Sequence, residues 1–72
     1  MARIVRISQV KPGGFFAIPD VDDLQSKDVS LEGHHLFVRG HYDRSLRKYF
    51  YTSCADVFFS SFMPSNTLVI VK

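Results

Sequence analysis

The sequence contains no tryptophan and only one cysteine, Cys54. A lone cysteine forms no internal disulfide and gives at most one ligand to a metal site, so the chain suits a reducing cytoplasm. Long apolar runs are also missing: the longest are four residues, as in Leu68 to Val71, whereas a membrane-spanning helix needs about 20. The first residues show no signal-peptide pattern. These absences predict a cytoplasmic protein without membrane contact.

The chain is short, and its aromatic residues must supply much of its core. With 72 residues, it makes one domain, residues 1–72, and buries only about 60% of its unfolded surface. That size excludes a cofactor-binding α/β enzyme or a solenoid, and we find no cofactor motif. Seven Phe and three Tyr provide the apolar bulk. A partner or a second copy of the chain would add stability, so we expect a homo-oligomer.

Charge is small in sum but unevenly distributed. Nine Lys and Arg against seven Asp and Glu give a net charge of +2, less than is usual for a protein that coats DNA. Residues 20–32 hold five acidic side chains and one lysine, whereas residues 39–48 hold four Arg or Lys, one His and one Asp. This separation predicts one acidic and one basic surface.

The first half of the chain contains two predicted strands and an acidic segment. Residues 2–7 are rich in β-branched side chains and predict a strand. Residues 11–14, Lys-Pro-Gly-Gly, predict a turn, and residues 15–18 predict a short strand that Pro19 ends. Asp20 is suited to cap one helical turn through Asp22, Asp23 and Leu24. With few apolar anchors in this segment, an ordered loop is the alternative.

The second half predicts a β-hairpin, a helical turn and a last strand. Residues 34–42 and 46–54 are aromatic and β-branched, and they flank the polar tripeptide 43–45. Val57, Phe58, Phe59 and Phe62 have spacings that fit a short helical or 3-10 turn. Residues 67–72 then predict a strand with both faces covered.

This order of elements predicts a mainly β fold. Five short strands with one turn before the last match a small SH3-like barrel, in which the closing strand pairs with the first. An OB-like five-stranded barrel, or an open sheet with one packed helix, is the alternative. The comparison rests on element order alone.

The loop length of the hairpin decides which side chains face outward. An odd loop, which we favour, buries Leu36, Val38, Phe50 and Cys54. It leaves the other face to Phe37, Arg39, His41, Arg47, Tyr49 and Tyr51. An even loop moves Tyr49 and Tyr51 into the core and places Phe50 and Lys48 beside Arg39 and His41.

Aromatic rings interleaved with cations are typical of surfaces that bind single-stranded DNA or RNA, because rings stack on bases and cations neutralise phosphates. We therefore predict a non-enzymatic nucleic-acid-binding domain. Its predicted binding residues are Phe37, Arg39, His41, Arg44, Arg47, Lys48, Tyr49 and Tyr51. The plain alternative is a solvated sheet face, since Tyr and Phe favour strands in any case.

A second functional hypothesis is a protein-interaction or inhibitor module. It would use the same face or an exposed cluster of Phe58, Phe59 and Phe62 as its interface. The other candidate sites are weak. His34 and His35 point to opposite faces of a strand, so we expect no metal site. Cys54 fits a small buried residue, and no pair of groups predicts catalysis.

Overall fold

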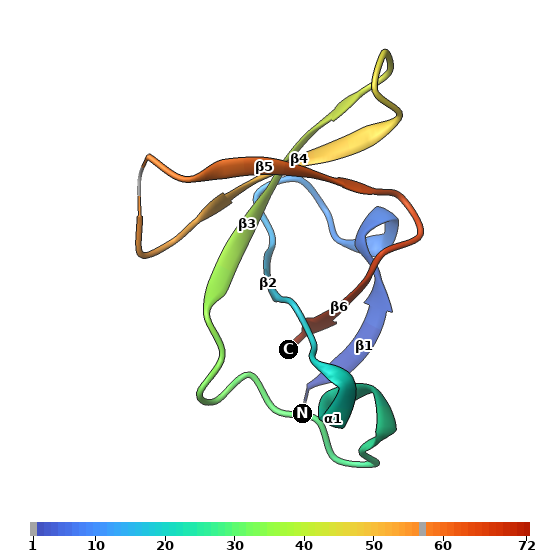
Figure 1. Ribbon diagram of the computed structural model, residues 1–72, viewed down its shortest axis with the longest axis vertical. Helices are drawn as coiled ribbons and strands as arrows, with labels where there is room; N and C mark the ends of the chain where they lie inside the picture. The colour runs from blue at the N-terminus through green and yellow to red at the C-terminus, as the bar shows by residue number, and fades with distance from the viewer. Residues whose placement is uncertain (1, 57) are drawn as a thin grey trace.

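A computed structural model describes residues 2–56 and 58–72. It contains one sheet of six antiparallel strands in the order β1-β6-β2-β3-β4-β5, together with one α-helix and one 3-10 turn (Figure 1). The mainly β class is therefore confirmed, with one strand more than predicted. The elements are β1 (Arg3–Arg6), the 3-10 turn η1 (Ile7–Gln9), β2 (Phe15–Ala17), α1 (Val21–Gln25), β3 (Leu36–Asp43), β4 (Lys48–Ser53), β5 (Ser60–Pro64) and β6 (Leu68–Val71).

The last strand pairs with the first, as predicted. β6 runs antiparallel to β1 from Leu68 to Val71 and touches β2 on its other side, where Ile70 lies opposite Ala17. Its two middle residues, Val69 and Ile70, point to opposite faces and are both fully buried, whereas Leu68 is 43% exposed. The strand pairings leave β1 and β5 as the two edges of the sheet. The closure that an SH3-like or OB-like barrel requires is not among these pairings.

The segment before the last strand is extended, so the helical turn predicted there is wrong for residues 60–62. β5 pairs with β4 along its length, with Met63 opposite Tyr49 and Phe62 opposite Phe50. In a short apolar run, spacing alone does not separate a helical turn from a strand. Here residues 60–64 pair with the backbone groups of β4 on the side away from β3. Val57, also assigned to the turn, lies outside the described residues.

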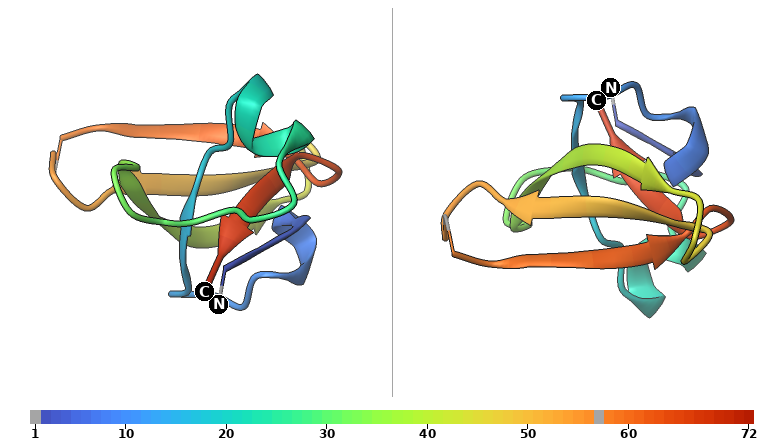
Figure 2. Two further views of the ribbon diagram at one scale, coloured as in Figure 1. Left: turned by 90° about the horizontal axis from the view of Figure 1, so that it is seen from below. Right: turned by 90° about the horizontal axis from the view of Figure 1, so that it is seen from above.

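The core forms where the sheet folds over on itself. β3, β4 and β5 lie side by side and β6 crosses beneath them (Figure 2). One cluster takes side chains from both halves of the sheet and from η1: Ile7, Val10, Phe16, Tyr51, Met63 and Val69. The Tyr51 ring meets Phe16 edge-on at 5.8 Å and Phe37 at 5.3 Å between ring centroids. Such edge-to-face contacts add about 0.5–1.5 kcal/mol each beyond burial.

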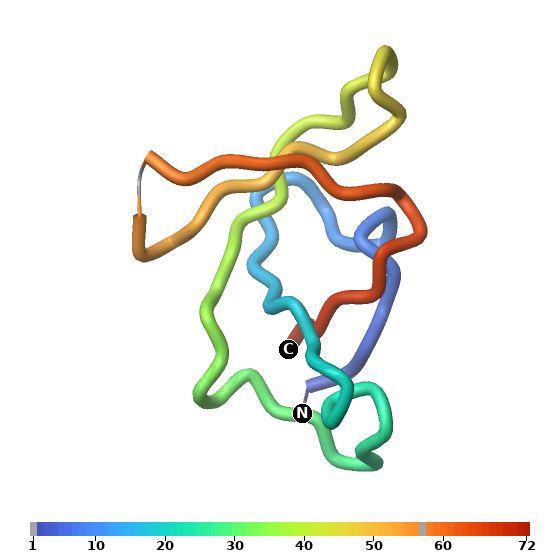
Figure 3. Tube along the Cα trace, viewed as in Figure 1, coloured from blue at the N-terminus to red at the C-terminus, as the bar shows by residue number. Residues whose placement is uncertain are grey.

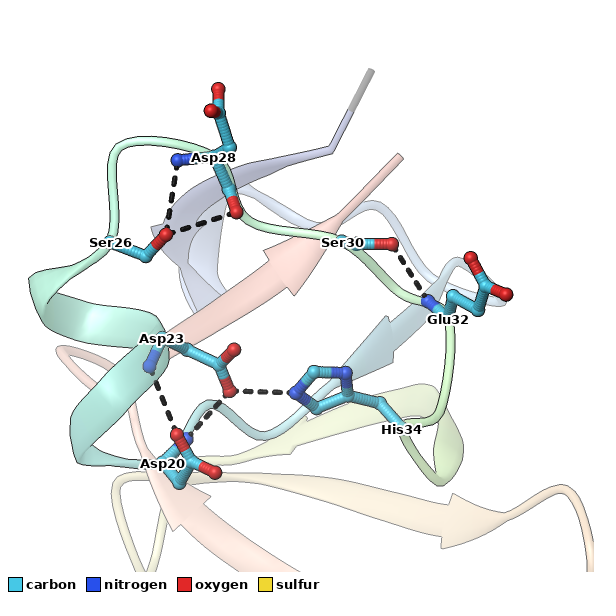
Figure 4. A network of polar contacts seen from close by, with 7 residues as sticks. All are labelled: Asp20, Asp23, Ser26, Asp28, Ser30, Glu32 and His34. Atoms are coloured by element: carbon cyan, nitrogen blue, oxygen red, sulfur yellow. Dashed lines mark hydrogen bonds and ion pairs between the residues drawn. The ribbon is translucent and has the colours of Figure 1, made fainter.

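The acidic segment begins with the helical turn that was one of its two predicted forms. Asp20 caps α1 by accepting a hydrogen bond from the Asp23 amide at 2.9 Å, and Asp23 Oδ2 accepts from the Asp20 amide at 3.0 Å. His34 donates from Nε2 to the same Asp23 oxygen at 2.6 Å (Figure 4). None of the residues of α1 is buried, so polar contacts hold it in place. No helix in the described parts of the chain is long and apolar enough to cross a membrane.

A bulge interrupts the hairpin of β3 and β4. Arg39 pairs with Tyr51 and Tyr42 pairs with Tyr49, so Gly40 and His41 together lie opposite the single residue Phe50. An extra residue reverses the faces of the strand beyond it. A Cβ atom on Gly40 would lie 2.6 Å from Cδ2 of Phe50 and 3.1 Å from its carbonyl oxygen. Glycine is therefore needed here for the Phe50 ring to cover the bulge.

The close approach of Phe50 predicts the effect of a Gly40→Ala substitution. The added methyl group overlaps the ring, and overpacking of this kind lowers the free energy of unfolding by about 1–3 kcal/mol. In a Phe50→Ala background the same substitution should cost less, because the ring and its Cδ2 atom are gone. Urea unfolding of the four variants of this cycle measures the coupling. Strict additivity would show that the ring is not what Gly40 accommodates.

The contact between His34 and Asp23 predicts a pH dependence. The hydrogen bond to Asp23 raises the pKa of His34 above its ordinary value of 6.5. The Asp20 amide, and then His34, lower the pKa of Asp23 below 3.8. The raised pKa adds stability that is complete below 6.5 and is lost as the pH rises through the folded pKa of His34. The lowered pKa adds stability that is present above 3.8 and is lost as the pH falls through the folded pKa of Asp23.

An NMR titration of the His34 ring should therefore give a midpoint above 6.5. Asp23→Asn should lower this midpoint, whereas the neighbouring Asp22→Asn should leave it nearly unchanged. Equal midpoints in both variants would show that Asp23 is not the group responsible.

Candidate functional site

The face of the hairpin that we predicted to be exposed lies against the core. Tyr51 is only 8% exposed and Arg39 only 9%, and Phe37 and Tyr49 pack half-buried against the core cluster. The loop between Asp43 and Lys48 has four residues, so the odd loop that we favoured is wrong. Phe37 pairs with Ser53 and Arg39 with Tyr51 because the bulge shifts the register by one residue. The choice of inner face was wrong. These four residues are therefore not available as a stacking surface.

The residues predicted to be buried lie toward the outside. Cys54 is exposed, and Leu36, Val38 and Phe50 are exposed or half-buried. The reason lies in β2 and the rest of the folded sheet. Phe16 of β2 stacks on Phe37 at 5.8 Å, and this contact places the odd-numbered side chains of the hairpin on the side that the other half of the sheet covers.

A row of three rings crosses the outer face of β3, β4 and β5. At the bulge, His41 faces outward and stacks on Phe50, with 5.3 Å between ring centroids and 22° between ring planes. Phe50 meets Phe62 of β5 edge-on at 5.4 Å. His41 is exposed, Phe50 is half-buried and Phe62 is 37% exposed. We call these three residues the aromatic row.

Cationic side chains gather where the hairpin ends, beside the aromatic row. Lys48 begins β4 opposite Asp43, and the loop that joins the two strands exposes Arg44 and Arg47. The Asp43 carboxylate accepts hydrogen bonds from the Ser45 and Leu46 amides at 2.9 and 3.1 Å, so it closes the loop. This end of the hairpin projects away from the rest of the chain (Figure 3). We call Arg44, Arg47 and Lys48 the basic end.

The three phenylalanines predicted to form one interface have three different environments. Phe58 is 94% exposed. Phe59 packs toward the core, 6.0 Å from the Phe37 ring and 6.1 Å from the Tyr51 ring. Phe62 belongs to the aromatic row. The structure does not bring them together as a single cluster.

Arg39 is a buried cation held by an aromatic ring. Its guanidinium carbon lies 4.4 Å from the centroid of Tyr49, at cation–π distance. Its Nε and Nη1 atoms have no hydrogen-bond partner among the described residues, and its backbone pairs with Gly13 and Gly14. Arg39 is therefore a core residue that packs on Tyr49 and not a surface contact.

The three histidines occupy three separate settings. His34 contacts Asp23, His41 belongs to the aromatic row, and His35 Nε2 lies 2.6 Å from Oγ of Ser53. The Ser53 oxygen also accepts hydrogen bonds from the amides of residues 55 and 56 at 3.1 and 3.2 Å. Its lone pairs are thereby used to close the turn after β4. The His35–Ser53 pair therefore supports a turn.

The sequence prediction missed Phe50 and Phe62 as partners in one row. Its even-loop alternative placed Lys48, Phe50 and His41 on one face, as the structure does above the bulge. Gly40 is the signal that could have identified the change of faces along β3, because a glycine inside a strand pattern marks a bulge or a close backbone approach.

The burial of Arg39 predicts opposite effects of two substitutions. Arg39→Met keeps most of the volume and removes an unpaired buried charge, so the free energy of unfolding should stay level or rise, by up to about 1–4 kcal/mol. Arg39→Ala leaves a cavity over Tyr49 and should lower it. Urea unfolding monitored by circular dichroism measures both. A loss in Arg39→Met as large as in Arg39→Ala would show that the charge itself stabilises the fold.

Comparisons with protein-family models, curated proteins and solved structures gave no match for this chain, so its function is inferred from the geometry of its own residues.

Proposed function

We propose that the protein binds single-stranded nucleic acid across the aromatic row and the basic end of the hairpin. The observation that carries the proposal is the row itself: on three adjacent strands, the Phe50 ring lies 5.3 Å from His41 and 5.4 Å from Phe62 on the outer face of the sheet. The exposed rings of His41 and Phe62 can stack on unpaired bases, and base stacking contributes about 1–3 kcal/mol per base.

The basic end supplies the second requirement, neutralisation of phosphates. Arg44, Arg47 and Lys48 are all exposed and lie at one end of the row. The carboxylate of Asp43, the acidic side chain closest in the sequence, accepts hydrogen bonds from loop amides. The net charge of +2 limits the nonspecific attraction, so affinity should be modest and strongly dependent on salt.

A protein partner is the second candidate function. Phe58 favours it, because a ring that is 94% exposed lies outside the aromatic row and needs another explanation. Self-association through this residue is part of the same hypothesis. The two functions separate cleanly, since one uses Phe62 and the other uses Phe58.

The proposal predicts losses for two variants in a fluorescence-anisotropy titration with a labelled single-stranded oligonucleotide. Phe62→Ala removes a stacking ring and should weaken binding by about 1–3 kcal/mol. Lys48→Gln removes one phosphate contact and should reduce the slope of log K against log salt by about 0.7.

Two matched variants serve as controls. Phe58→Ala removes an exposed ring outside the row, and Lys27→Gln removes an exposed lysine of the acidic segment. Both should bind like the wild type. Absence of binding at low salt, or equal losses in the test and control variants, would exclude the aromatic row as the binding surface.

A further inference from the structure

A groove at the opposite end of the sheet has the same chemistry as the proposed binding surface. It has a volume of about 540 Å³, and its lining joins the starts of β1, β2 and β3 to the turn before β2 and the end of the chain. Five of its residues are apolar and three are cationic: Val10, Phe15, Leu31, Leu36 and Val71, with Arg3, Lys11 and Lys72. We propose that this groove holds the continuation of the same nucleic-acid strand. This inference rests on the proposed function.

The register of the sheet connects the groove to the aromatic row. Phe15 of β2 lies opposite Val38, Val38 lies opposite Thr52, and Thr52 lies opposite Ser60. Residues paired across a sheet share a face. Along β4 and β5, Phe50 and Phe62 are two residues from Thr52 and Ser60, so they lie on that face too. Phe15 is therefore on the same outer face as the aromatic row, one strand beyond β3.

Exposure and charge at the groove fit a strand with unpaired bases. The Phe15 ring is 60% exposed and is free to stack on a base as the rings of the row would. Arg3, Lys11 and Lys72 lie around it, and no carboxylate side chain is among the residues that line the groove in the described chain. An acidic side chain, Glu32, lines the adjoining hollow together with Lys72.

Charge complementarity also admits an acidic peptide, and continuity decides between the two occupants. A peptide would need only the groove. A nucleic-acid strand explains why Phe15, on the face of the aromatic row, is followed at the edge of the sheet by the cations Arg3, Lys11 and Lys72. The basic end and the groove then mark the two ends of one path, with Phe15 and the aromatic row between them.

The length of the ligand tests this path. Anisotropy titrations would use single-stranded oligothymidylates of about 4 and about 12 nucleotides, which span much of the range of site sizes of small single-strand-binding sheets. The wild type should bind the longer one more tightly. The gain should exceed the statistical gain from the larger number of positions at which a protein can bind a longer oligonucleotide. Arg3→Gln combined with Lys11→Gln should lower the salt slope for the longer oligonucleotide by about 1.4, or about 0.7 per phosphate contact. It should leave the shorter one unchanged.

Phe15→Ala provides a readout of stacking. It should weaken the longer oligonucleotide about fivefold or more and leave the shorter one unchanged, with an unaltered circular dichroism spectrum. Lys27→Gln, an exposed lysine outside both surfaces, should affect neither length.

Three other outcomes would overturn the groove proposal, the proposed function or both. If the wild type binds both lengths equally and only Phe62→Ala weakens them, the groove proposal is wrong and the proposed function stands. If neither oligonucleotide binds, both are wrong. If a short acidic, leucine-containing peptide binds and the Arg3 and Lys11 double variant abolishes it, without any length effect for oligonucleotides, the groove belongs to a protein partner.

Discussion

The bulge in β3 is the constraint on which both faces of the sheet depend. Gly40 and His41 lie opposite the single residue Phe50, and this extra residue reverses the side-chain alternation of β3. Without it His41 would share the inner face with Arg39. With it, His41 stacks on Phe50 outside while Tyr42 meets Tyr49 at 4.8 Å on the other face. The lack of a side chain at Gly40 lets the Phe50 ring close over the backbone at this point.

A core this small cannot hide ten aromatic rings, and the fold divides them. Phe16, Phe37 and Tyr51 contact one another inside the folded sheet, where each buries a large apolar area. Phe50 and Phe62 contact each other on the outside. The inner rings pack in the core, whereas His41 and Phe62 of the outer row are exposed to solvent. These exposed rings, next to exposed cations, are the physical basis of the binding proposal.

The side chains of the acidic segment, residues 20–32, form hydrogen bonds that hold the segment in its conformation. Asp20 and Asp23 satisfy each other's amides and His34, and Ser26 exchanges hydrogen bonds with the backbone of Asp28 (Figure 4). Two of the acidic side chains thus cap α1, a helix with no buried residues. In Figure 1 this segment lies at the far end of the molecule from the basic end of the hairpin. The charges that the sequence separates along the chain are therefore separated in space as well.

The sequence by itself determined the mainly β class, the turn at residues 11–14 and the hairpin. It also determined that the last strand of the chain pairs with the first. These follow from local signals: β-branched runs, Gly and Pro punctuation, and an apolar strand that needs two neighbours. The face of the hairpin that we chose as the inner one was wrong, and part of the strand at residues 60–64 was assigned to a helical turn. Only the tertiary structure decided these, because the inner face is whichever one Phe16 and the other half of the sheet cover. Periodicity shows that a strand has two faces, but contacts from distant residues determine which face is buried.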